Sequence, residues 1–180
     1  MTFPLKLKTT IQAAAKLLQL NGGKMNYMYL LKLLYWADRE ALKETGHPIT
    51  GDDAKAMKLG PVPIRTYSMI LGSGAKAKEW QRCIKTVDYD VVLLNNPGDD
   101  ELSEYEIEKL TDAFEKHRHL DPFEMSALTH EFPEWEKNKP KDNGQKAIPL
   151  DDLLEALGLS SQKIELRKAA EYETKLEAMR

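Results

Sequence analysis

The sequence contains little of what marks a secreted or a membrane-spanning protein. Its single cysteine, Cys83, cannot form an internal disulfide and has no Cys or His neighbour at metal-ligand spacing, which is typical of a reducing compartment. No segment approaches the roughly 20 apolar residues that a membrane helix requires. The N-terminal segment, which lysines interrupt, also lacks the continuous apolar run of a signal peptide. We therefore predict a soluble protein of the cytoplasm with no membrane partner.

An excess of positive charge is missing as well. The chain has 26 Lys and Arg residues against 29 Asp and Glu residues, which gives a formal net charge of -3 at pH 7. Phosphate binding requires a clustered positive surface, so we expect no nucleic-acid partner. A DNA-binding regulator of its own operon remains an alternative, although no predicted helix clusters Arg or Lys as a recognition helix does.

The sequence does contain enough apolar residues, at helical spacing, to form one hydrophobic core. Hydrophobic residues make up 42% of the 180 residues, and this length fits one domain, residues 1–180, better than two. Apolar periodicity and capping residues predict helices over about 7–20, 26–46, 63–71, 103–119, 121–128, 150–157 and 160–179. The predicted fold is mainly α: a compact helical domain with one small β-hairpin or short antiparallel sheet.

The predicted β-structure is small. Two β-favouring runs, 84–87 and 91–94, flank Asp88-Tyr89-Asp90 and indicate a hairpin with a three-residue connection. A short strand is expected around 54–57, whereas the two prolines of Gly60-Pro61-Val62-Pro63 argue against a regular element there. The segment 137–148 is rich in Asn, Lys, Pro, Asp and Gly, so we expect an exposed loop.

The last segment, 160–180, is predicted to form a helix dominated by charged side chains. Its apolar residues do not hold one wide stripe, so we expect the helix to be mostly solvated or shared with a partner. Tyr172 lies among Lys168, Glu171 and Lys175, a composition typical of an aromatic interface anchor with a polar rim. We therefore expect Tyr172 to contribute to a partner-binding surface.

Residues that could carry chemistry are few. Asp38 falls on the apolar stripe of its helix, where an unpaired carboxylate is costly, so we expect a hydrogen-bonded carboxylate with a structural role. His117 and His119 diverge on a helix and, with His130, show no metal-ligand spacing. No Ser, Thr or Cys has the sequence context of a nucleophile. We predict no catalytic residue, no metal and no cofactor.

An enzyme remains the alternative from a different class. A small hydrolase or metal-dependent enzyme would use Asp38, His130 and a further carboxylate. Catalysis needs such groups to converge in one open cleft, whereas a structural role buries them singly. The relative placement of Asp38 and His130 therefore discriminates between the two hypotheses.

Two blocks of residues carry a resemblance to a known family. In the first, 32–63, an apolar helix contains Tyr35-Trp36-Ala37, a linker follows, and Ala56 precedes Gly60-Pro61-Val62. In the second, Leu128-Thr129-His130 is followed by Trp135. The order and separation of these blocks resemble the signature of the Panacea domain, the SocA-like antitoxin family of bacteria and their phages. Met57 departs from the pattern, because many family members have Trp there.

The resemblance implies a non-enzymatic antitoxin that holds a cognate toxin inactive by direct contact, the toxin usually being encoded beside it. Some relatives deliver the toxin to a AAA+ protease, so the resemblance also allows a protease-adaptor role. The candidate partner-binding or family-motif residues are Tyr35, Asp38, Gly60, Pro61, Val62, His130, Trp135 and Tyr172.

Overall fold

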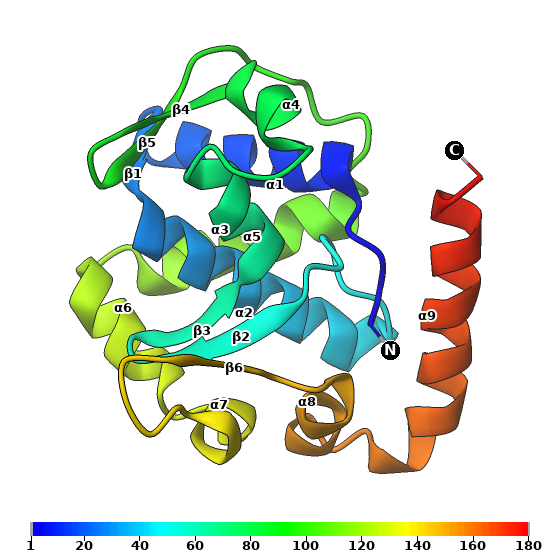
Figure 1. Ribbon diagram of the computed structural model, residues 1–180. Helices are drawn as coiled ribbons and strands as arrows, with labels where there is room; N and C mark the ends of the chain where they lie inside the picture. Colours follow the sequence, from blue (N-terminus) through cyan, green and yellow to red (C-terminus); the bar gives the residue numbers. More distant parts are fainter. Residues whose placement is uncertain (1, 180) are drawn as a thin grey trace.

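The computed structural model describes residues 2–179, and its architecture is mainly helical (Figure 1). The helices are α1 (Leu7–Leu20), α2 (Tyr27–Thr45), α3 (Ile64–Ile70), α4 (Ala77–Gln81), α5 (Glu104–His117), α6 (Pro122–Thr129), α7 (Pro133–Asn138), α8 (Leu150–Ala156) and α9 (Lys163–Glu177). The strands are β1 (Lys24–Asn26), β2 (Ala54–Met57), β3 (Gly60–Pro63), β4 (Ile84–Val87), β5 (Asp90–Leu93) and β6 (Gln145–Ala147). None of the described helices is both long and apolar enough to cross a membrane.

Helix α2 forms the centre of the core. Asn26 caps it, because its side chain accepts hydrogen bonds from the backbone N–H groups of Met28 and Tyr29. Gly46 ends it in the left-handed conformation, with φ of 78°. Neighbouring elements α1, α5, α6 and β3 cover α2 from several sides. A helix enclosed in this way needs apolar side chains around most of its circumference, which the Leu-rich sequence of α2 provides.

The described residues form two three-stranded antiparallel sheets, where the sequence indicated one. The first has the order β1-β5-β4 and contains the predicted hairpin; the second has the order β3-β2-β6. The added strands β1 and β6 have three residues each, too few to show an alternating pattern. The prediction of a single small sheet was therefore wrong, and the mainly helical fold class is confirmed.

The prediction that Gly60–Pro63 is irregular was also wrong. Strand β3 pairs with β2, so that Pro61 lies opposite Ala56 and Pro63 opposite Ala54. Proline is tolerated in an edge strand where its missing N–H faces away from the neighbouring strand, and β3 is an edge of its sheet. All four residues of β3 are buried.

Two further local predictions need correction. The connection between β4 and β5 is the two-residue Asp88-Tyr89, because β5 already begins at Asp90 opposite Val87. Asp88 takes a positive φ of 54°, which two-residue hairpin turns favour. The segment 137–148 is not wholly a loop, because α7 extends to Asn138 and β6 pairs with β2. Residues 141–147 are nevertheless exposed, as predicted.

Helix α9 lies at the edge of the molecule, beside the N-terminal segment (Figure 1). It follows a 3-10 turn, Ser160–Gln162, and not a serine cap as the sequence suggested. Leu166 and Ala170 on one face are buried in a small cluster with Phe3, Leu42, Leu154 and Leu157. The same helix exposes Ile164, Tyr172 and Leu176. Helix α9 is thus packed on the body along one edge.

Candidate functional site

The two motif blocks, far apart in the sequence, meet at the turn between β2 and β3. The indole N–H of Trp135 donates a 2.9 Å hydrogen bond to the carbonyl oxygen of Met57. The hydroxyl of Ser126 in α6 donates a 2.6 Å hydrogen bond to the carbonyl oxygen of Leu59. Helices α6 and α7 therefore hold the backbone that carries Gly60, Pro61 and Val62.

Gly60, the first residue of β3, lies against both α2 and α6. Its φ is +102°, and a Cβ atom at this position would lie 2.4 Å from Oγ1 of Thr129 and 2.9 Å from Nζ of Lys32. The left-handed conformation disfavours a side chain, and the two neighbours leave no space for one. Gly60 therefore allows the first motif block to pack directly against the second.

Lys32, which the sequence analysis did not single out, is buried beneath this turn. Its side chain is 1% exposed, and Nζ donates a 2.7 Å hydrogen bond to the carbonyl oxygen of Pro61. No carboxylate among residues 2–179 pairs with this ammonium group. Burial lowers the pKa of Lys32 to about 7. The available signal was a lysine within the leucines of 30–34, all of which are buried.

His130 packs against Trp135 at the end of α6. The ring centroids are 4.0 Å apart and the ring planes are 6° from parallel, so the two rings are stacked. Burial lowers the pKa of His130, and the positive charge of Lys32 lowers it further. Both effects favour the neutral imidazole.

Tyr35 joins the two blocks through a buried ion pair. Its hydroxyl donates a 2.9 Å hydrogen bond to Oε1 of Glu134, and Nε of Arg39 donates a 2.8 Å hydrogen bond to the same oxygen. The Glu134 side chain is fully buried, which is tolerable because both donors satisfy it. Neither Arg39 nor Glu134 was singled out from the sequence, since charged residues on helices are usually solvated.

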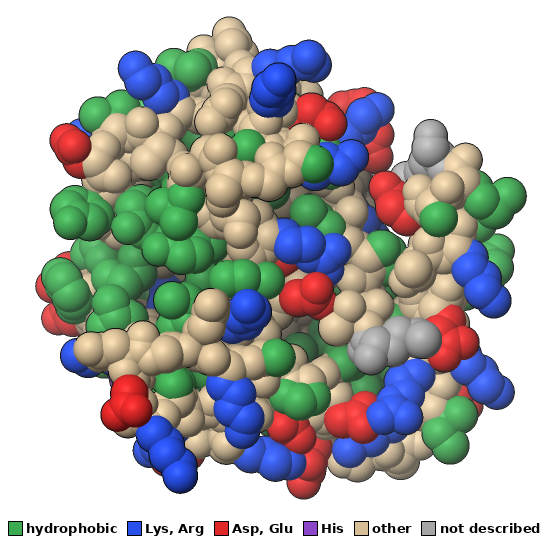
Figure 2. Space-filling model, in the orientation of Figure 1, with side chains coloured by type: hydrophobic (Ala, Val, Ile, Leu, Met, Phe, Trp, Pro, Cys, Tyr) green, Lys and Arg blue, Asp and Glu red, His purple; other side chains and the backbone are tan. Residues whose placement is uncertain are grey.

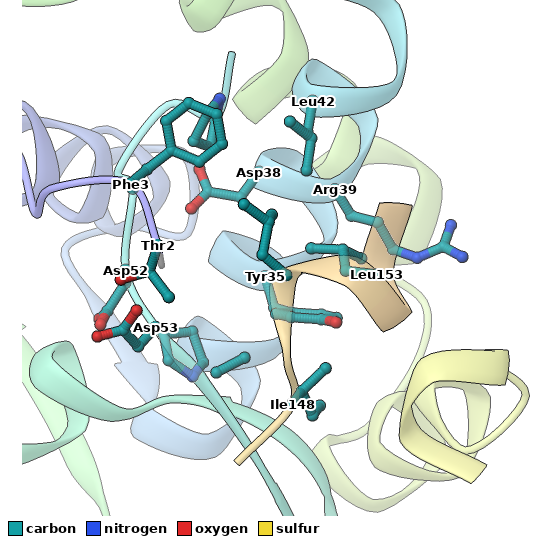
Figure 3. A pocket seen from close by; sticks show the side chains of 15 residues that line it. Thr2, Phe3, Tyr35, Asp38, Arg39, Leu42, Asp52, Asp53, Ile148 and Leu153 are labelled. Carbon is teal, nitrogen blue, oxygen red and sulfur yellow. The ribbon is translucent and has the colours of Figure 1, made fainter. Parts of the chain in front are cut away.

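Asp38 lines a small cavity of about 60 Å³ near the N-terminal segment (Figure 3). In this view the carboxylates of Asp38, Asp52 and Asp53 lie toward one side, whereas the guanidinium of Arg39 points away. A cavity of this volume accommodates a few water molecules and not a substrate. Among residues 2–179, no group of three or more His, Cys, Asp or Glu side chains is placed to hold a metal ion.

Asp38 has the hydrogen-bonding partner that the sequence indicated. The backbone N–H of Thr50 donates a 2.8 Å hydrogen bond to Oδ1, and the Thr50 hydroxyl donates to Oδ2. Burial raises the pKa of Asp38 to about 6, although these hydrogen bonds lower it. His130 does not line the cavity of Asp38. The hydrolase hypothesis requires Asp38 and His130 to converge, and in that cavity they do not.

A larger hollow of about 570 Å³, here called the apolar groove, opens beside the β2–β3 turn. Figure 2 shows hydrophobic side chains gathered on this face, over the region where Figure 1 has the start of α2, α6 and the β2–β3 turn. Its volume is within the range of pockets that bind ligands or partner side chains. Residues of both sheets and of three helices line it, among them Tyr27, Lys32, Val62, Tyr67, Tyr89 and Phe123.

The structure gathers most of the sequence-predicted site residues and separates two of them. Around the β2–β3 turn lie Tyr35, Gly60, Pro61, Val62, His130 and Trp135. Asp38 lies in the neighbouring cavity. Tyr172 is 64% exposed on α9 and does not line the apolar groove.

Comparison with known proteins adds one match. A family model described as "Antitoxin SocA-like, Panacea domain" matches residues 30–136. The matched region covers more than half of the chain and includes both motif blocks. Searches among curated proteins and among solved structures find no match.

Proposed function

Because the chain belongs to the SocA-like antitoxin family with the Panacea domain, we propose that it neutralises a cognate protein toxin by binding it directly. The observation that carries the proposal is the family match over residues 30–136, which contains the two motif blocks. A hydrogen bond from Trp135 joins these blocks, and one from Ser126 in α6 holds the same turn. The apolar groove beside this unit supports the proposal, because open apolar surface of this kind is typical of interaction sites.

We propose further that the protein acts in the cytoplasm and without catalysing a reaction. Asp38 is hydrogen-bonded to Thr50, and His130 is stacked on Trp135, so each has a structural partner of its own. An Asp38→Asn variant should therefore neutralise the toxin as well as the wild type does. Loss of neutralisation in a folded Asp38→Asn variant would favour the enzyme hypothesis.

Co-expression with neighbouring reading frames tests the main proposal. Expression of one neighbouring product alone should arrest growth, and co-expression of this protein should restore it. The two proteins should also elute together as one complex in size-exclusion chromatography. If no neighbouring product is toxic or forms a complex, the antitoxin proposal is wrong.

The fate of the toxin separates two routes of neutralisation. Inhibition by contact leaves the amount of toxin unchanged, whereas an adaptor for a AAA+ protease shortens its half-life. We propose inhibition by contact. Toxin half-life, measured with and without this protein after synthesis is stopped, decides between the routes; a shortened half-life would assign the adaptor role.

A further inference from the structure

The apolar groove has walls of exposed and half-buried aromatic side chains. Tyr89 is 72% exposed and Phe123 is 70% exposed, although both line the groove. Tyr27 lies between Tyr67 and Tyr89, with ring centroids 6.0 Å and 6.1 Å away. Aromatic side chains held in this way dominate the binding energy of many protein interfaces, because they lose little conformational entropy on binding.

The charge of the groove has one sign. Its lining includes two lysines, Lys32 and Lys58, and no Asp or Glu, although the chain as a whole has a net charge of -3. Lys58 is exposed at the rim, whereas Lys32 is buried at the bottom. The groove is therefore complementary to a ligand that is apolar and carries a negative charge.

Lys32 has unused capacity for such a ligand. An ammonium group has three N–H donors, and Lys32 donates to one acceptor, the carbonyl oxygen of Pro61. Within residues 2–179 no acidic side chain balances its charge. A buried, unpaired charge is unfavourable, so a carboxylate that reaches it gains a charge-assisted hydrogen bond.

We propose that the apolar groove binds a segment of the toxin that inserts a large apolar side chain between the aromatic walls and places a carboxylate on the ammonium group of Lys32. This inference rests on the proposed antitoxin function and names the site and the chemistry of the partner. A protein segment is the favoured occupant because the exposed side chains of Tyr89 and Phe123 extend the apolar surface beyond the hollow, and a partner protein can bury such a surface.

Selection of peptides on the intact protein provides the first test. A library of random peptides displayed on phage is panned against the wild type. Enriched peptides should share a large apolar residue close to Asp, Glu or the free C-terminal carboxylate. Panning against Lys32→Met should retain the apolar residue and lose the acidic group. Absence of enrichment, or enrichment without an acidic group, overturns the proposal.

A double-mutant cycle then isolates the contact with Lys32. The best peptide and its amide counterpart, with Asn, Gln or a C-terminal amide in place of the acid, are titrated against the wild type and Lys32→Met. Removing either partner should weaken binding about tenfold to a hundredfold, the range of a hydrogen bond to a charged group. Removing both should cost no more than removing one. Additive losses contradict a direct contact.

Exposed apolar residues supply a matched control. Phe123→Ser should weaken peptide binding at least tenfold, whereas Leu71→Ser, 55% exposed and outside the groove lining, should leave it unchanged. Both positions are exposed, so both variants are expected to keep the wild-type unfolding midpoint. Equal binding by Phe123→Ser and the wild type overturns the assignment of the groove.

Two further outcomes separate this inference from its alternatives. Dodecanoate that displaces the peptide and binds more tightly than any peptide would assign the groove to a small amphiphile and overturn the proposal. When the toxin is identified, Lys32→Met and Phe123→Ser should rescue growth less well than the wild type. Full rescue by both variants would reject the groove while the rescue by the wild type still supports the antitoxin function.

Discussion

Nζ of Lys32 lies 2.7 Å from the carbonyl oxygen of Pro61, which follows 29 residues later in the chain. This hydrogen bond joins the central helix α2 to the edge strand β3 through a buried charge. No acidic side chain among residues 2–179 balances that charge. The protonation of Lys32 is therefore coupled to the stability of the folded protein.

Replacing Lys32 with Met should remove a pH-dependent part of the stability. The Lys32 pKa is about 7 in the folded protein and returns to its ordinary value of 10.5 on unfolding, so between these values the unfolded chain binds more protons. Wild-type stability should therefore rise with pH above about 7, by at most about 1.4 kcal/mol per pH unit. Urea unfolding across this range should show the rise in the wild type and in Lys58→Met, but not in Lys32→Met. Parallel pH profiles for all three proteins would contradict the assignment of this pH dependence to Lys32.

Gly60 should tolerate a side chain far less well than Gly74 does. Both have a positive φ, +102° and +87°, but a Cβ atom at Gly60 meets Thr129 and Lys32 whereas at Gly74 it meets nothing within 4 Å. Gly74→Ala should cost about 1 kcal/mol for the backbone conformation alone. Gly60→Ala should cost about 2 to 4 kcal/mol, because overpacking is added, and Gly60→Val should cost at least as much. Equal losses of unfolding free energy for Gly60→Ala and Gly74→Ala, measured by chemical denaturation, would show that the close packing around Gly60 does not contribute to stability.

Asp38 should destabilise the protein as the pH rises through its folded pKa. That pKa is about 6, above the ordinary 3.8, so the folded state binds more protons in between. Stability should fall by about 2 kcal/mol from about pH 4 to about pH 6. Asp38→Asn, which still accepts from the Thr50 backbone N–H and can donate its amide to the Thr50 hydroxyl, should lack this contribution, and Asp142→Asn on the surface should keep it. Asp38→Ala should lose about 1 to 3 kcal/mol, with the larger loss near pH 4, because Thr50 is left unpaired; an unchanged midpoint for Asp38→Ala would refute the structural role.

The two faces of α9 should separate folding from binding. Leu166→Ala should lower stability by about 2 to 3 kcal/mol, because Leu166 is buried in the cluster with Phe3, Leu42 and Leu154. Tyr172→Ser should leave the unfolding midpoint unchanged and weaken neutralisation of the toxin, since Tyr172 is exposed. A variant lacking 160–180 that remains folded and neutralises at full strength would exclude α9 from the toxin-binding surface.

Most of the longer helices were predictable because their signals are local, whereas the short helices α4 and α7 were not predicted. Asn26 caps α2, and Ser103 and Asp121 each form a capping box at the start of α5 and α6, as their spacing indicated. The additional strands were not predictable, because strand pairing depends on distant partners. The three residues of β6 form a strand by pairing with residues 55–57 of β2. Strand β3 is held in place by hydrogen bonds from α6 and α7 to the turn that precedes it.

The residues of the candidate site likewise fall into those that the sequence identified and those that only the tertiary structure revealed. The resemblance identified Gly60, His130 and Trp135, and the structure supplies the packing that links them. Lys32 and Glu134 escaped notice because the sequence does not state which charged residues are buried; that depends on the tertiary structure around them. The position of Lys32 among four leucines was the one local indication of its burial. This indication is ambiguous, because no acidic partner for the lysine could be named from the sequence.

The turn that Trp135 and Ser126 hold also determines when the protein becomes competent during synthesis. The hydrogen bond from Trp135 to Met57 spans 78 residues, and the one from Tyr35 to Glu134 spans 99. Contacts of such sequence separation form late and slow folding. A nascent chain that ends before α7 leaves Met57, Tyr35 and Arg39 without these partners, and Gly144, on the rim of the groove, emerges later still. The ribosome must therefore release the chain beyond Gly144 before the apolar groove is complete, so the groove can bind a partner only after this late-folding part of the domain has emerged.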